Sequence, residues 1–493
     1  MTKDHNEMKN NNGLNSKSKN NGQLSFDELW DVSEDIGKKY ENGKKEIELE
    51  TDNFFKKEPF PITLVRDFEQ FISYVENHPI HLTKTMEYIS RRHLPEINNR
   101  MTVRNEAATS HTEQEYYPYI HLFYFLGLSG QLLKKESGKG GKFTLEQADR
   151  LQLYKELTDI EKYFFLLEIL WVDVNWARLL NERYNSLTFS LQEIFFMLSE
   201  EKEGYKIFLQ ESGNLKERIL ADRLDKWGYF LLYFEWFGFW ECEIDQEHVD
   251  TYYRKNQYFA KSIMLTDFGS KVIPILLLDR NLQIWNIPER RVSGEVNPIP
   301  GAELEDMMYG EIPDMVVNAI FERMEVDQSS QPFFLPFKSL YPNESLHRTL
   351  PRNRRKFIEG IYTFRVSLSS GVWRKVVLSG KHTMEHLHYM IINSFDFDDD
   401  HLYSFFMDGK KWSNDCITSP HDFDEHPKSN KVQIGGLGLV SGQRFLYLYD
   451  FGDEWSFIVE MDSIRETVSE PFQPYVKESK GKAPDQYGEE EYW

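Results

Sequence analysis

The chain has few cysteines, no long hydrophobic run and a shortage of positive charge. Its 493 residues include only two cysteines, Cys242 and Cys416, without the spacing of a metal-binding knuckle. This excludes a disulfide framework and favours a reducing compartment. Charged residues interrupt the most apolar stretch, residues 163–180, so its apolar runs are far shorter than the roughly 20 residues of a membrane span. The polar N-terminus lacks the apolar core of a signal peptide, so we expect a soluble cytoplasmic protein without a membrane segment.

The charge balance argues against nucleic acid as the main partner. The 80 Asp and Glu residues outnumber the 58 Lys and Arg residues, and the formal net charge is −22. A phosphate-binding surface needs clustered Lys and Arg, so only a local basic patch would serve it. We therefore expect the partner to be a protein rather than a nucleic acid.

Aromatic residues are abundant enough to fill several cores. Phe, Tyr and Trp make up 15% of the sequence, and the length predicts two to four domains. The predicted segments are a disordered tail at 1–22, a helical domain at 23–186, a helical or winged-helix-like domain at 187–326, a Pro/Arg-rich linker at 327–356 and an α+β domain at 357–493.

The first helical domain is predicted from hydrophobic periodicity. The stretch "LVRDFEQFISYVEN" places apolar residues on one helical stripe, and residues 159–180 are apolar nearly all round, as in a central helix. The stripe consists of Leu64, Phe68, Phe71, Ile72 and Val75.

The second domain has the order of elements of a winged-helix unit. A helix leads into the aromatic strand "GFWECEI", "FAKSIML" is a second strand, and Thr266 begins a helix because its hydroxyl can accept from free backbone N–H groups. A helical domain with one hairpin is the alternative. On the winged-helix interpretation Arg254, Lys255 and Lys261 are candidate DNA contacts.

The linker ends in a second basic cluster. It carries four prolines, which resist helix because they lack an N–H donor, and then the run "HRTLPRNRRK". Its cations, which are candidate DNA contacts or solvated charges, are Arg348, Arg352, Arg354, Arg355 and Lys356.

The C-terminal domain alternates strongly between apolar and polar residues. "GIYTFRVSLSS" and "VWRKVVL" read as strands, and "TMEHLHYMIINSF" reads as a helix that begins after Thr383. A turn at Asp408-Gly409 and the pair "RFLYLYDF" and "EWSFIVEM" add hairpins. The predicted class is α+β, with an antiparallel sheet and helices.

The tripeptide Asp-Phe-Gly, which binds magnesium in protein kinases, occurs at 267–269 and at 450–452. A kinase also needs a Gly-rich phosphate loop and a catalytic-loop aspartate, and the chain has neither. The first copy suits a helix start. In the second copy Asp450, Gly452 and Asp453 suit a turn, because they accept local N–H bonds and take positive φ.

The C-terminal domain resembles the plasmid pRiA4b ORF-3-like family, whose members are also labelled insertion-element TnpR-like passenger proteins. The matching phrases, in order, are "VWRKVVL", "HTMEHLHYMI", "FDDDHLYSF" and "YLYDFGDEWSFIVEM". The resemblance implies an MM3350-like α+β fold and a link to mobile elements, but no established activity. The helical N-terminal part resembles the extension of Gram-positive members.

Four residues within these phrases form a candidate site: His388, His401, Asp450 and Asp453. Imidazole and carboxylate are ligands for zinc or iron and also the usual acid–base pair. Trp373, Arg374 and Trp455 are candidate pocket-lining residues. The alternative is a buried polar network that fixes the fold without chemistry.

Two other groups of residues are interpreted as solvated. His382 and His386 lie one helical turn apart, and the acidic run 396–400 lacks the loop pattern of a calcium site. Strand-transfer chemistry is not expected, because the chain lacks the His-x-x-Arg segment of tyrosine recombinases.

We therefore favour a non-enzymatic binding or scaffold protein with no cofactor. A metal-dependent enzyme that uses a divalent ion is the first alternative, and a DNA-associated regulator is the second.

Overall fold

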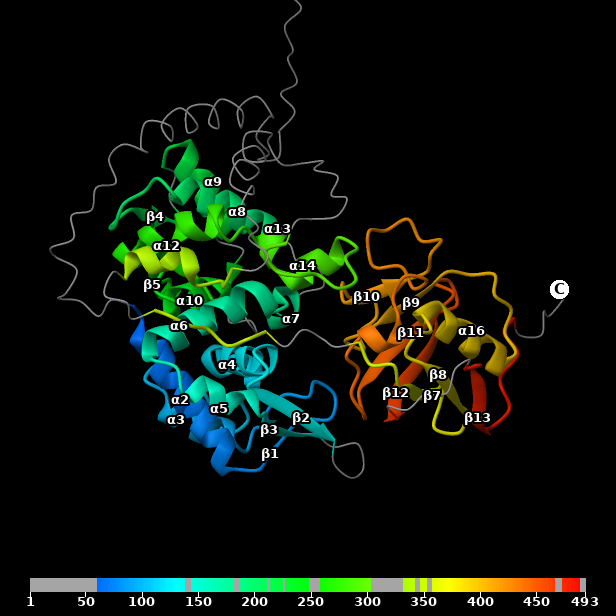
Figure 1. Cartoon of the computed structure of the whole chain (residues 1–493). Helices are drawn as coiled ribbons and strands as arrows, with labels where there is room; N and C mark the ends of the chain where they lie inside the picture. Colours follow the sequence, from blue (N-terminus) through cyan, green and yellow to red (C-terminus); the bar gives the residue numbers. More distant parts are fainter. Residues whose placement is uncertain are drawn as a thin grey trace, which may run out of the picture. The chain divides into compact units, whose positions relative to one another are not determined.

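A computed structural model describes the chain in ten stretches (Figure 1). They form an N-terminal helical part, up to residue 352, and a C-terminal α+β domain, and each is described by itself. The expected tail at 1–22 lies outside the described residues, as do five candidate DNA contacts: Arg254, Lys255, Arg354, Arg355 and Lys356. The described stretches are 60–137, 143–180, 187–210, 213–224, 227–247, 258–302, 331–341, 346–352, 357–465 and 472–487.

The first half of the helical part is built around the predicted stripe on α2 (Ile62–Asn77), whose five apolar residues are all buried. A small antiparallel sheet of order β1-β3-β2 lies beside the helices. The other elements are β1 (Ile80–His81), α3 (Leu94–Arg100), η2 (Gln114–Tyr116), α4 (Pro118–Ser129), β2 (Leu133–Ser137), β3 (Phe143–Gln147), α5 (Arg150–Lys155), α6 (Asp159–Glu168), the π-helical turn η3 (Ile169–Asp173) and α7 (Trp176–Leu180).

The second half has the connectivity of a winged helix. Its sheet has the order β4-β6-β5, so the strand that comes last in sequence among the three lies in the middle. The strand β4 was not predicted from the sequence, because it has three residues and only the central one is buried. The elements are α8 (Leu187–Leu198), β4 (Lys206–Phe208), α9 (Leu215–Leu224), α10 (Tyr229–Trp236), β5 (Trp240–Ile244), β6 (Ala260–Leu265) and α12 (Asp267–Leu278), followed by α13 (Leu282–Trp285) and α14 (Ile287–Val292).

The helix α10 occupies the place of the DNA-reading helix, the second of a helix-turn-helix pair. Its sequence, YFLLYFEW, has no Lys or Arg, and four of its eight residues are buried. Trp236 packs edge-on against Tyr119 of α4, with ring centroids 4.2 Å apart. The winged-helix unit therefore uses this helix to pack against its own chain.

The segment predicted as a linker is packed in the part that the structure describes. The 3₁₀ helix η6 (Leu335–Leu340) buries Phe337, whose ring lies 5.0 Å from that of Phe164. The buried Arg280 donates to the carbonyls of Pro332 and Phe333 at 2.9 and 2.8 Å. The prolines of this segment allow only a short 3₁₀ helix, and its aromatic residues supply the apolar area that docks it.

The same segment closes an ion-pair network at the π-helical turn η3. Arg352 donates to both carboxylate oxygens of Asp173 at 2.7 and 2.8 Å, and to Glu168 at 2.9 Å. Thr349 also donates to Glu168 at 2.9 Å. Burial raises the pKa of Glu168, although Arg352 opposes that change. Two basic residues proposed for DNA contact, Arg348 and Arg352, are thus paired with carboxylates.

Replacing Arg352 with alanine should lower the free energy of unfolding of the helical part by about 2–3 kcal/mol, since it leaves the buried carboxylate of Glu168 with only the Thr349 hydroxyl as a partner. Arg348→Ala is the matched control: Arg348 is 54% exposed and lies 3.4 Å from Glu161, so the cost should stay below about 1 kcal/mol. Native-state hydrogen exchange of α6 in the full chain measures both. Equal effects of the two variants would contradict the network.

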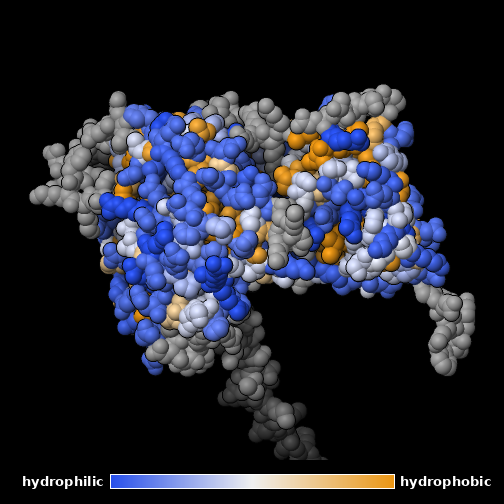
Figure 2. Space-filling view, turned by 90° about the horizontal axis from the view of Figure 1, so that it is seen from below, coloured by the Kyte–Doolittle hydropathy of each residue, from blue (hydrophilic) through white to orange (hydrophobic). Residues whose placement is uncertain are grey.

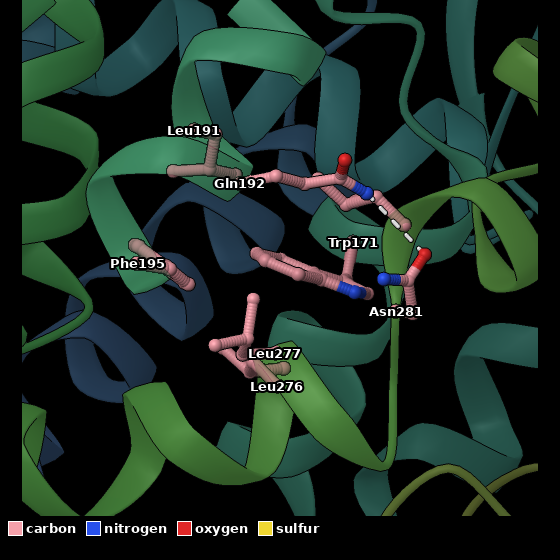
Figure 3. A pocket seen from close by; sticks show the side chains of 8 residues that line it. Trp171, Leu191, Gln192, Phe195, Leu276, Leu277 and Asn281 are labelled. Carbon is pink, nitrogen blue, oxygen red and sulfur yellow. Dashed lines mark hydrogen bonds between the residues drawn. The ribbon is translucent and has the colours of Figure 1, made fainter. Parts of the chain in front are cut away.

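The helical part contains a small, partly open cavity between α8, η3 and α12 (Figure 3). Trp171 and Phe195 form part of an apolar wall, and the polar groups are Gln192 and Asn281, which share a hydrogen bond of 3.3 Å. Its free volume is about 10 Å³, which is at the lower limit for one water molecule. This cavity is therefore too small for a substrate.

The C-terminal domain is a seven-stranded antiparallel sheet of order β10-β9-β11-β12-β7-β8-β13, with α16 against one face. The predicted α+β class is confirmed, and the apolar faces of the sheet and of α16 form one core. Its elements are β7 (Ile361–Ser367), β8 (Trp373–Ser379), α16 (Met384–Phe395), β9 (Tyr403–Phe406), β10 (Cys416–Thr418), η7 (Ile434–Gly436), β11 (Arg444–Tyr449), β12 (Trp455–Arg465) and β13 (Tyr475–Lys480).

Both copies of Asp-Phe-Gly serve the fold. In the first, the Thr266 hydroxyl accepts from Gly269 N at 2.9 Å and caps α12, as predicted. In the second, Asp450 accepts from Gly452 N at 2.9 Å in the turn between β11 and β12. One detail was wrong: Asp450 and Glu454, at φ 55° and 53°, take the left-handed conformation, and Gly452 and Asp453 do not.

No helix among the described residues combines the length and the apolar character that a membrane crossing requires. On the face that Figure 2 shows, hydrophobic residues form small groups between hydrophilic ones.

Candidate functional site

His388 lies at the centre of a hydrogen-bonded group in the C-terminal domain. It is on the buried face of α16 and is 1% exposed. Its Nδ1 lies 2.7 Å from the hydroxyl of Tyr447 on β11, and its Nε2 lies 2.8 Å from Oδ1 of Asp399. The imidazole also stacks on Tyr403 of β9, with ring centroids 3.7 Å apart. Both ring nitrogens and one ring face are therefore occupied by the chain itself.

The partners of His388 define its protonation state. A carboxylate only accepts hydrogen bonds, so Nε2 carries the proton and donates it to Asp399. The other nitrogen, Nδ1, then accepts from the hydroxyl of Tyr447. Burial lowers the pKa of His388 to about 4, and the charge of Asp399 opposes that change only in part. The imidazole is therefore neutral at pH 7.

His401 and Asp450 form a second, more open pair. The distance between His401 Nε2 and Asp450 Oδ2 is 3.5 Å, and the same nitrogen lies 3.5 Å from Asp400 Oδ1. The His401 side chain is 38% exposed, whereas Asp450 is buried. Asp453 lies exposed in the turn before β12. The structure thus brings His401 and Asp450 together, and it gives His388 other partners, Asp399 and Tyr447.

The proposed pocket-lining residues act in packing. Arg374 donates to the carbonyls of Ser394 and Lys480, at 2.7 and 3.0 Å, and its guanidinium lies 4.6 Å from the ring centroid of Phe395. It thereby joins the end of α16 to β13. Trp455 packs edge-on against Phe397, with ring centroids 4.9 Å apart. Trp373 is on the opposite face of the sheet, where Arg365 lies 4.7 Å above its ring.

The sequence interpretation of the acidic turn as solvated was wrong, because Asp399 bonds to the buried His388, and the tyrosines around the turn were missed. The Tyr449 hydroxyl accepts from the backbone N–H of Asp400 and His401 at 3.1 and 3.3 Å. Tyr487 donates to Asp400 Oδ2 at 2.7 Å. The phrase "RFLYLYDF" was assigned only to a hairpin strand, and no short-range signal linked Tyr447 or Tyr449 to a turn some 50 residues away.

Within the stretches that the structure describes, no group of three or more His, Cys, Asp or Glu side chains is arranged to hold a metal ion. Of the four residues of the candidate site, His401 and Asp450 form one pair, His388 has other partners and Asp453 is an exposed carboxylate. Such paired imidazoles and carboxylates can orient a tyrosine hydroxyl or a backbone turn, which is what His388 does with Tyr447.

All of these groups lie in one region of the chain, and this region matches a known protein family. Residues 360–491 match the family model of the plasmid pRiA4b ORF-3-like protein. The predicted resemblance is thereby confirmed for the C-terminal domain, and every residue of the candidate site falls inside the matched pRiA4b ORF-3-like region. The match begins at residue 360, so it does not extend to the helical part.

A comparison with solved structures also found a similar protein. It is the crystal structure of the protein of unknown function MM3350 from Methanosarcina mazei Go1, at 23% sequence identity. The match covers 26% of this chain and 74% of that chain, with a TM-score of 0.23. A comparison with curated proteins gave no match.

Acid should destabilise both parts of the chain, because buried neutral histidines must take up protons. The pKa values of His388 and of the buried His121 are each lowered from 6.5 to about 4. The unfolded state therefore binds more protons between these values, and stability is lost as pH falls from about 6.5 towards 4. Each histidine contributes up to about 3 kcal/mol.

Hydrogen exchange of the C-terminal sheet between pH 7 and pH 4.5 tests this dependence for His388. In His388→Gln the amide retains polar partners but does not titrate, so the pH slope of stability should flatten in that domain. The slope in the helical part, where His121 accounts for it, should not change. An unchanged slope in the C-terminal domain would show that His388 is not the titrating group.

Proposed function

We propose that the chain is a non-enzymatic binding or scaffold protein with a cytoplasmic location and a protein partner. The observation that carries this proposal is the pairing of both ring nitrogens of His388, which leaves no lone pair free for a metal or a substrate proton. Its hydroxyl partner, Tyr447, is itself fully buried. Such a fully satisfied network rigidifies a domain and need not take part in a reaction.

Metal content of the purified full chain tests this proposal against the first alternative, a metal-dependent enzyme. The partly exposed pair of His401 and Asp450 favours that alternative, since an imidazole and a carboxylate are common metal ligands. We expect far less than one equivalent of zinc, iron or manganese per chain, both in the wild type and in His401→Ala. A full equivalent that disappears in His401→Ala would overturn the proposal.

The second alternative, a DNA-associated regulator, rests on the winged-helix order of elements. The apolar sequence of α10 and the ion pair of Lys261 with Glu243, at 3.7 Å, speak against it. Nonspecific binding is strongest at low salt, so a gel shift in about 20 mM salt is the sensitive assay. A shift that high salt abolishes would restore this alternative.

We also propose a link to mobile elements. Its support is the family description alone, which names a plasmid open reading frame. Capture of partners from a lysate that contains a related plasmid, compared with a lysate that lacks it, tests this link.

A further inference from the structure

We propose that two copies of this chain pair face to face through the outer face of the seven-stranded sheet, the face that points away from α16. This inference concerns assembly and stands apart from the proposed function, because a dimer is compatible with a binder and with an enzyme. It rests on two rows of side chains that cross the strands of this face. The first is the charged row and the second is the apolar row.

The charged row crosses five adjacent strands in register. Backbone pairing aligns its members from β11 through β12, β7 and β8 to β13. Their charges run plus, minus, plus, plus, minus. In this order the residues are Arg444, Glu460, Arg365, Lys375 and Glu478.

The apolar row lies on the same face, two residues away from the charged row on each strand. Leu446 of β11 pairs with Ile458 of β12, and Ile458 pairs with Ser367 of β7. Ser367 pairs with Trp373 of β8. Ile458 is 52% exposed in the middle of the sheet, whereas Leu446 and Trp373 are partly buried.

The order of charges makes the face complementary to itself. A twofold axis parallel to the strands and above β7 places β12 of one copy over β8 of the other, and β11 over β13. Arg444 then faces Glu478 of the second copy, and Glu460 faces Lys375. Each of these two contacts occurs twice in the dimer, so four of the five facing pairs are attractive. In the fifth pair, Arg365 faces Arg365 of the second copy. The same operation sets Ile458 on Trp373.

The strand edges are less suited to pairing than the face. The edge strand β13 carries Lys477 and Lys480, and its register is broken by a bulge after Val476. Lysines and bulges on an edge prevent another strand from adding to it. The opposite edge, β10, is only three residues long. We therefore expect a second copy to pair through the outer face, where a twofold axis brings the same surface of both copies together.

Sedimentation velocity of the full chain at several concentrations is the direct test. The contact spans roughly 20 Å across five strands, so we expect a reversible dimer with a dissociation constant on the order of 10 μM. Ile458→Arg should weaken it at least tenfold. Leu153→Arg, at a residue of α5 that is 44% exposed, should leave it unchanged. A monomer at about 200 μM, well above that constant, would overturn the proposal.

Charge reversal tests the geometry and does not depend on the apolar row. Arg444→Glu and Glu478→Arg should each weaken the dimer several-fold, and the double variant should regain the affinity. Within one chain these residues lie four strands apart, about 19 Å, so recovery cannot come from a contact inside the chain. If the double variant dimerised as weakly as the single variants, the twofold arrangement would be wrong. A dimer whose affinity did not change in Ile458→Arg would also overturn it.

Discussion

Replacing His388 with alanine should lower the free energy of unfolding of the C-terminal domain by about 4 kcal/mol. The substitution empties a fully buried site that the imidazole fills by stacking on Tyr403, and large-to-small changes in a core cost roughly 3–5 kcal/mol. It also leaves the buried hydroxyl of Tyr447 without its partner, which adds to the cost. Hydrogen exchange of β9 and β11 in the full chain measures this effect.

His401→Ala is the matched control for that experiment. His401 lies in the same domain, but its side chain is 38% exposed and its nearest carboxylate oxygens are 3.5 Å away. Its removal should cost less than about 1 kcal/mol, as for other exposed ion pairs. If His401→Ala lowered the free energy of unfolding as much as His388→Ala, the distinction between a buried structural histidine and a partly exposed one would be wrong.

Replacing Gly269 with alanine should destabilise the winged-helix unit by about 3 kcal/mol or more. A Cβ atom at this position would lie 1.9 Å from the carbonyl oxygen of Phe239. This carbonyl oxygen belongs to the backbone, so the clash can be relieved only if the start of α12 moves away from Phe239. Overpacking of this kind typically costs 1–3 kcal/mol, and more where backbone must move.

The second Asp-Phe-Gly provides the comparison. At Gly452 an added Cβ would meet only Asp450 Oδ1, at 3.2 Å, and the residue does not adopt positive φ. We expect Gly452→Ala to change the free energy of unfolding by less than about 1 kcal/mol. Thermal unfolding of both variants, followed by fluorescence of the tryptophans, checks the pair of expectations. A tolerated Gly269→Ala would contradict the close approach of α12 to Phe239.

Local patterns predicted most of the fold. The stripe on α2, the cap at Thr266 and the alternation of β7 depend on residues close in sequence, and each appears as expected. The short strand β4 escaped notice because a period of two cannot be recognised in three residues. The linker was misjudged because prolines report on local conformation, whereas the docking of Phe337 depends on distant partners.

The candidate site was harder to predict for the same reason. His388 was singled out by its residue type, but its partner Asp399 lies in an acidic turn that reads as a solvated loop. The contact between them forms only because Asp396 ends α16 in a left-handed conformation and turns the chain back. Tyr449 joins that turn from a strand about 50 residues further on. Contacts between residues this far apart in sequence depend on tertiary packing, so they produce no periodic pattern in the sequence.

The protonation state of His388 tests the central claim most directly. Nitrogen NMR of the imidazole in the full chain, recorded from pH 7 to pH 5 with and without added zinc, reports which nitrogen carries the proton. The network predicts a neutral ring protonated at Nε2 throughout, with no response to zinc. A ring that titrates near pH 6.5, or whose nitrogens shift when zinc is added, would contradict a closed structural network at His388.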